Sequence, residues 1–143
     1  MSLPILRSAF PPSILKRRLR SPAGRVLAEA YDDVFGDPWR VWTVGGCHVF
    51  AVAAARVRRR DTICIFGSLK AGGIEHAMVM EGETTMLDAD GVAGIRELYL
   101  RYTEGFRSYP IEFVSLESLE SWLKPRDREF ADRLEKVLRG EKS

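Results

Sequence analysis

The fold is decided by residues 45–66, which read GGCHVFAVAAARVRRRDTICIF. From Phe50 to Val57 apolar side chains recur at the i, i+3, i+4 and i+7 positions that share one helix face. A run of alanines lets this helix pack closely against a sheet. Residues 62–66 are rich in β-branched and aromatic side chains and predict a strand. The segment therefore predicts a deeply buried helix that leads directly into a β-sheet.

The flanking pattern extends this pair into an α+β domain. Towards the N-terminus, residues 23–35 have helical periodicity and residues 38–46 form a loop with two tryptophans and adjacent glycines. Beyond the first strand we predict two strands joined as a hairpin, a helix, a strand, a short helix and a charged C-terminal helix, over residues 76–80, 84–87, 91–102, 111–114, 116–123 and 126–138. Strands that follow one another through tight turns favour a small antiparallel sheet of three or four strands with segregated helices.

Length and composition limit the chain to one domain. It has 143 residues, of which 45% are hydrophobic and 29% charged, enough for one core and too little for two. Residues 1–22 are rich in Pro, Arg and Ser and read as an N-terminal arm, with one short basic helix over residues 13–20. We expect residues 23–143 to form the single domain.

Charge and cysteine content indicate which partners and which cell compartment to expect. The net charge is only +2, so nucleic-acid binding would depend on the basic cluster Lys16-Arg17-Arg18-Leu19-Arg20 in the arm, which also fits a solvated helix face. We do not expect a nucleic-acid partner. Two cysteines are too few for a disulfide framework, and no apolar stretch resembles a signal peptide or a membrane span. A cytoplasmic protein without a membrane partner is expected.

Cys47 is the candidate nucleophile. It follows Gly45-Gly46 at the start of the predicted helix, where unpaired backbone N–H groups and the helix dipole favour a thiolate and lower the thiol pKa. The same N–H groups are suited to stabilising an oxyanion. The alternative is that Cys47 is a buried cysteine with only a packing role. Its assignment as the nucleophile therefore depends on a nearby base that accepts the thiol proton.

His76 is the better of two candidate bases. The other, His48, directly follows Cys47, so its side chain points about 100° away around the helix. His76 starts a predicted strand, and the next strand ends in Asp88. A three-residue loop that pairs residue 80 with 84 would place His76 opposite Asp88 on one sheet face, whereas a two-residue loop would not. The expected triad therefore requires an odd loop, with Asp90 in a turn.

These residues resemble the papain-like superfamily of cysteine enzymes, in its transglutaminase-like and NlpC-type branches. The resemblance covers Gly45-Gly46-Cys47, then Glu75-His76-Ala77-Met78-Val79, then Leu87-Asp88-Ala89-Asp90-Gly91, as in small uncharacterised bacterial and phage proteins of that type. It implies a papain-like core, and a thiol hydrolase or acyl transferase in which Cys47 attacks, His76 is the base and Asp88 orients it. A peptide or protein substrate is implied, and no cofactor.

The sequence departs from that superfamily in one respect. Papain-type peptidases place a glutamine before the cysteine for the oxyanion hole, and this chain contains no glutamine. Gly46, Trp42 and Asp90 are the remaining candidates for the oxyanion or substrate site. A metal site built from Cys47, His48, Cys64 and His76 has none of the usual ligand spacings, so no metal is expected. A catalytically inactive papain-like binding or regulatory module, of phage or toxin-system origin, is the alternative function.

Overall fold

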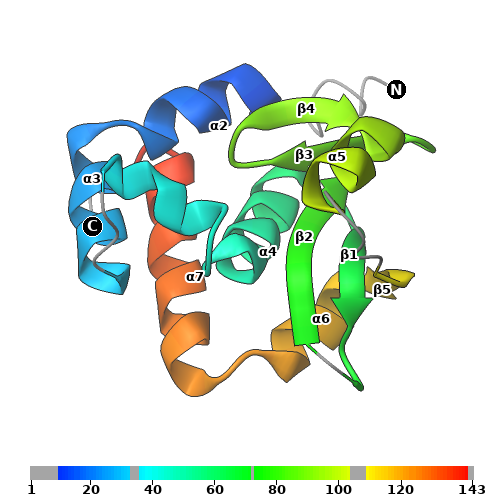
Figure 1. Ribbon diagram of the computed structural model, residues 1–143. Coiled ribbons are helices and arrows are strands. Elements are labelled where there is room, and N and C mark those ends of the chain that lie inside the picture. Colours follow the sequence, from blue (N-terminus) through cyan, green and yellow to red (C-terminus); the bar gives the residue numbers. More distant parts are fainter. Residues whose placement is uncertain (1–9, 33–35, 72, 104–108, 142–143) are drawn as a thin grey trace, which may run out of the picture.

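A computed structural model describes residues 10–32, 36–71, 73–103 and 109–141. Over these residues the chain forms six α-helices, one 3-10 helix and a five-stranded sheet, which confirms the predicted α+β class (Figure 1). None of the described helices is long and apolar enough to cross a membrane.

The elements follow the order predicted from the sequence, with one strand added. The helices are α2 (Pro12–Leu19), α3 (Pro22–Tyr31), the 3-10 helix η1 (Pro38–Trp42), α4 (Cys47–Arg58), α5 (Ile95–Tyr102), α6 (Leu116–Trp122) and α7 (Pro125–Leu138). The strands are β1 (Thr62–Ser68), β2 (Gly73–Met80), β3 (Thr85–Asp88), β4 (Gly91–Gly94) and β5 (Ile111–Ser115). The sheet order is β4-β3-β2-β1-β5, and every neighbouring pair is antiparallel.

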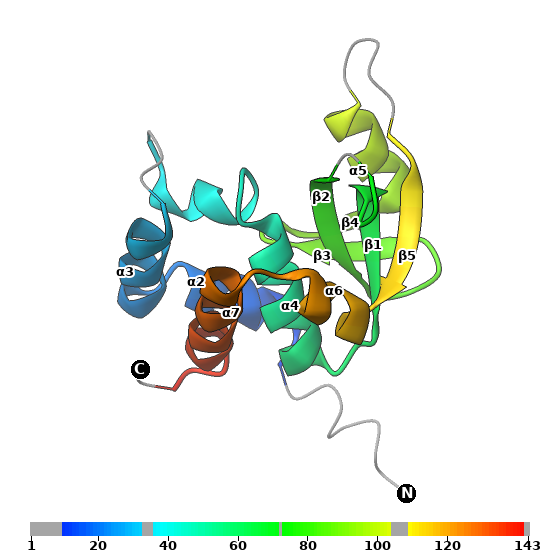
Figure 2. The ribbon, with the colours of Figure 1, turned by 90° about the horizontal axis from the view of Figure 1, so that it is seen from below.

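Helix α4 is the centre of the molecule. It lies between the sheet on one side and α2, α3 and α7 on the other (Figures 1 and 2). All of its residues are buried except His48 and Arg56, as the alanine-rich sequence predicts for a helix enclosed on most sides. The helix therefore holds its first residue, Cys47, in a fixed position relative to the sheet.

The two faces of the sheet bury different sets of side chains. Ala77 and Val79 of β2 face α4 and belong to the larger core. The alternate residues of β2 face α5, where Met78 joins Phe66 and Leu98 in a second, smaller cluster. This alternation decides which side chains of β2 lie near Cys47 and which lie near α5.

The predicted helix over residues 91–102 is wrong at its start. Residues 91–94 form β4, which pairs with β3 so that Gly91 lies opposite Asp88 and Gly94 opposite Thr85. Gly91 has a φ of 124°, which a side chain would strain, so the chain reverses here and adds a strand before α5 begins. The sheet accordingly has five strands instead of three or four.

The short helix predicted in the N-terminal arm is present as α2. Its Leu15 and Leu19 are fully buried in the same core as α4 and α7. Gly24 allows α3 to cross close to the end of α2, because a Cβ at this position would lie 2.1 Å from the Leu19 carbonyl oxygen. From residue 10 onward the arm is thus part of the packed structure.

Candidate functional site

A buried histidine–aspartate pair stands at the junction of β2 and β3. His76 Nε2 lies 2.9 Å from Asp88 Oδ2, and the two side chains are 0% and 3% exposed. Because a carboxylate only accepts hydrogen bonds, Nε2 carries the proton, and in a neutral imidazole Nδ1 then carries the lone pair. Nδ1 is buried and has no hydrogen-bond partner among the described residues. The pair therefore leaves a ring nitrogen that is able to accept a proton.

The register between β2 and β3 brings these residues together diagonally. Met80 lies opposite Met86, so the five residues 81–85 connect the paired positions. The odd parity predicted from the sequence is confirmed, but the pairing is shifted by two residues from the predicted pair of 80 with 84. Asp88 consequently shares a sheet face with His76 and reaches it along the diagonal instead of from directly opposite.

Cys47 begins α4, as predicted, with its thiol almost completely enclosed. The residue is 5% exposed, and the backbone amides of Ala77, His48 and Cys47 itself lie near enough to the sulfur to favour its thiolate. Two of these amides belong to the first turn of α4, where N–H groups have no partner within the helix. The third belongs to the residue that follows His76 in β2.

The expected lowering of the Cys47 pKa is not found in this arrangement. Burial raises the pKa of the thiol to about 11, because desolvation penalises the thiolate more than the three amides favour it, and the negative charge of Glu75 acts in the same direction as burial. A helix N-terminus is thus the weaker influence when little water reaches the sulfur. The resting cysteine is a thiol, and its chemistry requires a base.

The raised pKa predicts a loss of stability in alkali. The unfolded chain releases the Cys47 proton near the ordinary cysteine pKa of about 8.5, while the folded chain retains it up to about 11. Between these values the folded state binds more protons, so the free energy of unfolding falls by at most about 1.4 kcal/mol per pH unit for this group. Urea denaturation at pH 8 and pH 10 should show a smaller fall for Cys47→Ser than for the wild type. Equal falls would contradict the assignment.

Cys47 lies beside β2, the strand that carries His76, but the two side chains are not hydrogen-bonded to each other. Cys47 packs in the core on the α4 side, whereas His76 stacks on Tyr102, with ring centroids 3.9 Å apart, on the α5 side. The Ala77 amide links the strand to the sulfur, and Tyr102 lines the pocket that Cys47 also lines. The structure thus brings His76 and Asp88 together and places Cys47 beside the same strand, with the thiol and the imidazole not bonded.

A pocket of about 410 Å³ opens beside Cys47. Its wall combines the turn over residues 43–45 with side chains from α4, β2, α5 and α6. These side chains are Cys47, His48, Ile74, Glu75, Tyr102 and Trp122. The pocket is large enough for a substrate side chain, so a group bound there would lie next to the sulfur.

The other predicted site residues have different surroundings. The Gly46 N–H donates to the Val41 carbonyl at 2.7 Å, so this amide is already occupied. Trp42 is fully buried against Tyr31, with ring centroids 5.3 Å apart, and does not line the pocket. Asp90 is exposed, and its N–H donates to Asp88 Oδ1 at 2.9 Å, consistent with the predicted turn. The amide of Ala77 is the neighbour of the sulfur that the sequence did not indicate.

A second histidine–aspartate pair also borders the pocket. His48 Nε2 lies 2.9 Å from Asp127 Oδ2 of α7, and Asp127 Oδ1 accepts a hydrogen bond from the Tyr31 hydroxyl at 3.0 Å. The edge of the His48 ring meets Trp122, with centroids 5.7 Å apart. Sequence reasoning set His48 aside as a neighbour of Cys47, and no local signal links it to a residue 79 positions later.

Cys64 is not part of this site. Cys64 lies on β1 in the smaller core, with Phe66 and Met78, and is not exposed. Among the residues that the structure describes, no group of three or more His, Cys, Asp or Glu side chains is arranged to hold a metal ion.

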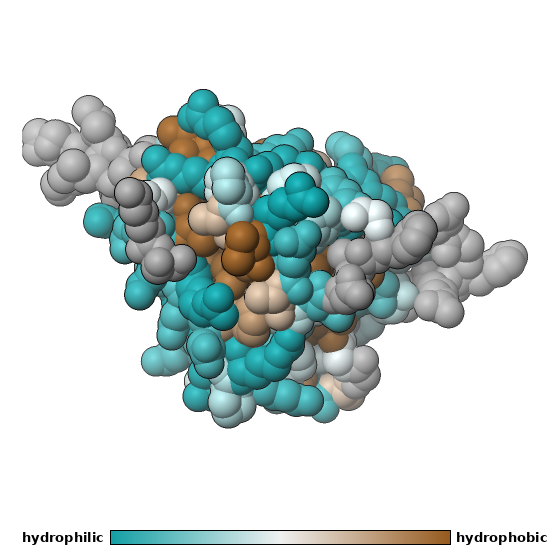
Figure 3. Space-filling view, turned by 90° about the vertical axis from the view of Figure 1, so that its left-hand side faces the viewer, coloured by the Kyte–Doolittle hydropathy of each residue, from teal (hydrophilic) through white to brown (hydrophobic). Residues whose placement is uncertain are grey.

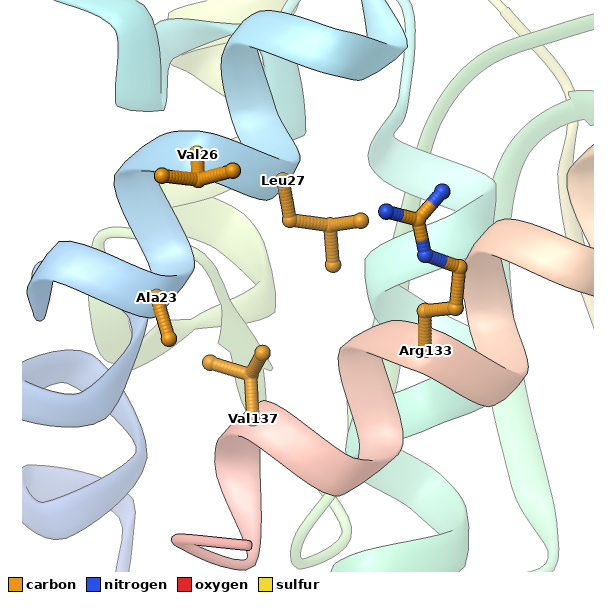
Figure 4. Close-up of a pocket in the computed structure, with 5 residues that line it drawn as sticks. All are labelled: Ala23, Val26, Leu27, Arg133 and Val137. Carbon is orange, nitrogen blue, oxygen red and sulfur yellow. The ribbon is translucent and has the colours of Figure 1, made fainter. Parts of the chain in front are cut away.

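A further hollow lies on the far side of the molecule, between α3 and α7. It interrupts a largely hydrophilic surface with a small apolar area (Figure 3), and Ala23, Val26, Leu27 and Val137 line it with Arg133 at its rim (Figure 4). Among the described residues that line it there is no cysteine, histidine or carboxylate.

Comparisons with protein-family models, curated proteins and solved structures found no match. Any statement about function therefore depends on the site itself.

Proposed function

We propose that this protein is a thiol-dependent hydrolase or acyl transferase of the papain-like type, acting on a peptide or protein substrate. Cys47 is the nucleophile, His76 the general base and Asp88 the residue that positions the base. The observation that carries the proposal is the buried His76–Asp88 pair, in which Nδ1 of His76 has no partner among the described residues and is one residue from an amide near the Cys47 sulfur. A core histidine with only a packing role would leave this buried acceptor uncompensated.

The reaction follows from the protonation states at the site. Because the resting thiol is protonated, its proton passes to Nδ1 of His76 as the sulfur attacks the substrate carbonyl carbon. A sulfur–carbon bond forms, and Asp88 stabilises the imidazolium through Nε2–H. When the tetrahedral adduct collapses, the imidazolium returns the proton to the leaving group. Water or another nucleophile then takes the acyl group from the sulfur.

Backbone amides supply the oxyanion donors in this proposal. The N–H groups of Cys47, His48 and Ala77 lie near the sulfur and are suited to an oxygen that develops charge beside it. They replace the side-chain donor that a glutamine provides in papain-type peptidases. Since Nδ1 and Sγ are not hydrogen-bonded at rest, substrate binding must bring them into contact, as apo sites commonly require.

Acylation of Cys47 by p-nitrophenyl acetate tests the proposal. The sulfur displaces p-nitrophenolate, so the wild type should release a burst of one equivalent per chain, with the acetyl group found on Cys47 by mass spectrometry. Cys47→Ser should fold and show no burst. His76→Ala should slow acylation by roughly 10²–10⁴-fold, the usual contribution of a general base.

Cys64→Ala is the matched control, because Cys64 is fully buried in the other core cluster, and it should acylate like the wild type. A burst of equal rate in His76→Ala, or no acylation of Cys47, would contradict the enzyme. Either result would favour an inactive binding or regulatory module that keeps the same arrangement.

A further inference from the structure

The pocket at Cys47 is lined by one carboxylate, that of Glu75. Glu75 of β2 is exposed and lines it, and the Glu75 charge is felt at the Cys47 sulfur, where it raises the thiol pKa. The pKa of the Tyr102 hydroxyl, which also lines the pocket, is raised chiefly by burial and further by the charges of Asp88 and Asp90, while Arg101 lowers it. Among the described residues that form the wall there is no lysine or arginine. A positively charged group in the pocket would therefore meet attraction, and a carboxylate would meet repulsion.

Aromatic rings form other parts of the same wall. Trp122 of α6 is 37% exposed, and its ring is nearly perpendicular to that of His48, with centroids 5.7 Å apart. Tyr102 is held by its stack on His76. Aromatic faces attract ammonium and guanidinium groups, and a tryptophan does so most strongly. An exposed tryptophan in a pocket with a carboxylate is thus a suitable surface for a cation.

His48 adds a hydrogen-bond acceptor. Its Nε2–H donates to Asp127, so in the neutral ring Nδ1 carries a lone pair. An acceptor in the wall of the pocket favours an N–H donor as the bound group.

We propose that the pocket binds a positively charged amine or guanidinium group of the substrate, with Glu75 as its counter-ion and Trp122 as its aromatic wall. This assignment rests on the proposed function, because it identifies the substrate of that reaction as a cationic peptide. The charge preference itself is a property of the pocket and is measurable without turnover.

The test compares three methanethiosulfonate reagents that differ in charge: aminoethyl (cationic), methyl (neutral) and sulfonatoethyl (anionic). Each transfers its thioalkyl group to the Cys47 sulfur and releases methanesulfinate, while the thiol proton passes to solvent. Mass spectrometry of the Cys47 peptide gives the rates, normalised to those of N-acetylcysteinamide. The normalised cationic-to-anionic ratio should be about tenfold or more at low salt and should shrink at high salt.

Glu75→Gln should reduce that ratio several-fold, since it removes the charge and keeps the shape. Glu83→Gln is the matched control, an exposed carboxylate in the β2–β3 connection outside the pocket, and it should keep the ratio. A wild-type ratio within twofold of the free thiol, equal ratios in wild type and Glu75→Gln, or no reaction of Cys47 with any of the three reagents would overturn the assignment. A charge preference that persists in a protein whose acylation does not need His76 would uphold this inference while the enzyme proposal fails.

Discussion

Replacing Asp88 by alanine is expected to slow acylation of Cys47 by roughly 10²–10⁴-fold, because His76 loses the acceptor that holds its proton on Nε2. Without that acceptor the ring is free to place its proton on Nδ1, the atom that receives the thiol proton in the proposed reaction. The variant also leaves Nε2 buried and unpaired, at a cost of about 1–3 kcal/mol in the free energy of unfolding. The burst rate with p-nitrophenyl acetate and a urea titration measure the two effects separately.

The Asp88→Asn variant distinguishes a role of Asp88 in positioning His76 from a role in packing alone. Both carboxylate oxygens accept hydrogen bonds, Oδ2 from His76 and Oδ1 from the Asp90 amide. An asparagine offers only one oxygen, so it must either present its NH₂ group to His76 or give up the bond to Asp90. Its acylation rate should lie between those of the wild type and Asp88→Ala. A wild-type rate in both variants would show that Asp88 does not position the base.

Replacing Glu81 by alanine is expected to lower the free energy of unfolding by about 3–5 kcal/mol, the usual cost of removing one partner of a buried ion pair. Glu81 Oε2 accepts from Arg58 Nε at 3.1 Å, and Oε1 accepts from Arg60 Nη2 at 3.0 Å. The Arg58 and Glu81 side chains are only 7% and 8% exposed, so alanine would leave the Arg58 charge without its main partner. Urea denaturation at pH 7 measures the loss.

The Glu81 effect should disappear in acid. Burial alone would raise the pKa of this carboxyl, but the hydrogen bonds and charges of Arg58 and Arg60 outweigh burial and lower it. The stabilisation is therefore present above the unfolded carboxyl pKa of about 4.3 and is lost as the pH falls through the lower folded value. The exposed neighbour Glu83 is the control, since Glu83→Ala should change the free energy of unfolding by no more than about 0.5 kcal/mol. A loss no larger for Glu81→Ala than for Glu83→Ala would contradict the ion-pair account.

The local parts of the candidate site were predictable because period and parity are local properties. The glycines before Cys47 and the apolar spacing after it place this residue at the start of a buried helix, and α4 begins there. The parity of the β2–β3 connection places His76 and Asp88 on one sheet face, and the two side chains are hydrogen-bonded. The observed register differs from the predicted one by two residues. An odd connection is compatible with several pairings that differ by two residues, so parity alone does not select one of them.

The residues around the thiol were not predictable in the same way. Glu75, Tyr102 and Trp122 come to the pocket from three different elements, and Asp127 reaches His48 from the C-terminal helix. No spacing along the chain relates these residues, because their proximity depends on how α5, α6 and α7 pack on the sheet and on α4. The same is true of Arg58 and Glu81, which lie at the end of α4 and in the β2–β3 connection.

The sequence by itself determined the α+β class, the burial of α4 and the face shared by His76 and Asp88, since each follows from a repeat of 3.6 or 2 residues. The tertiary structure decided the protonation of Cys47. A helix N-terminus predicted a low thiol pKa, but enclosure by β2 and the surrounding helices removes water from the sulfur and raises the pKa to about 11. Desolvation is a property of the assembled core, and no local pattern in a sequence carries it.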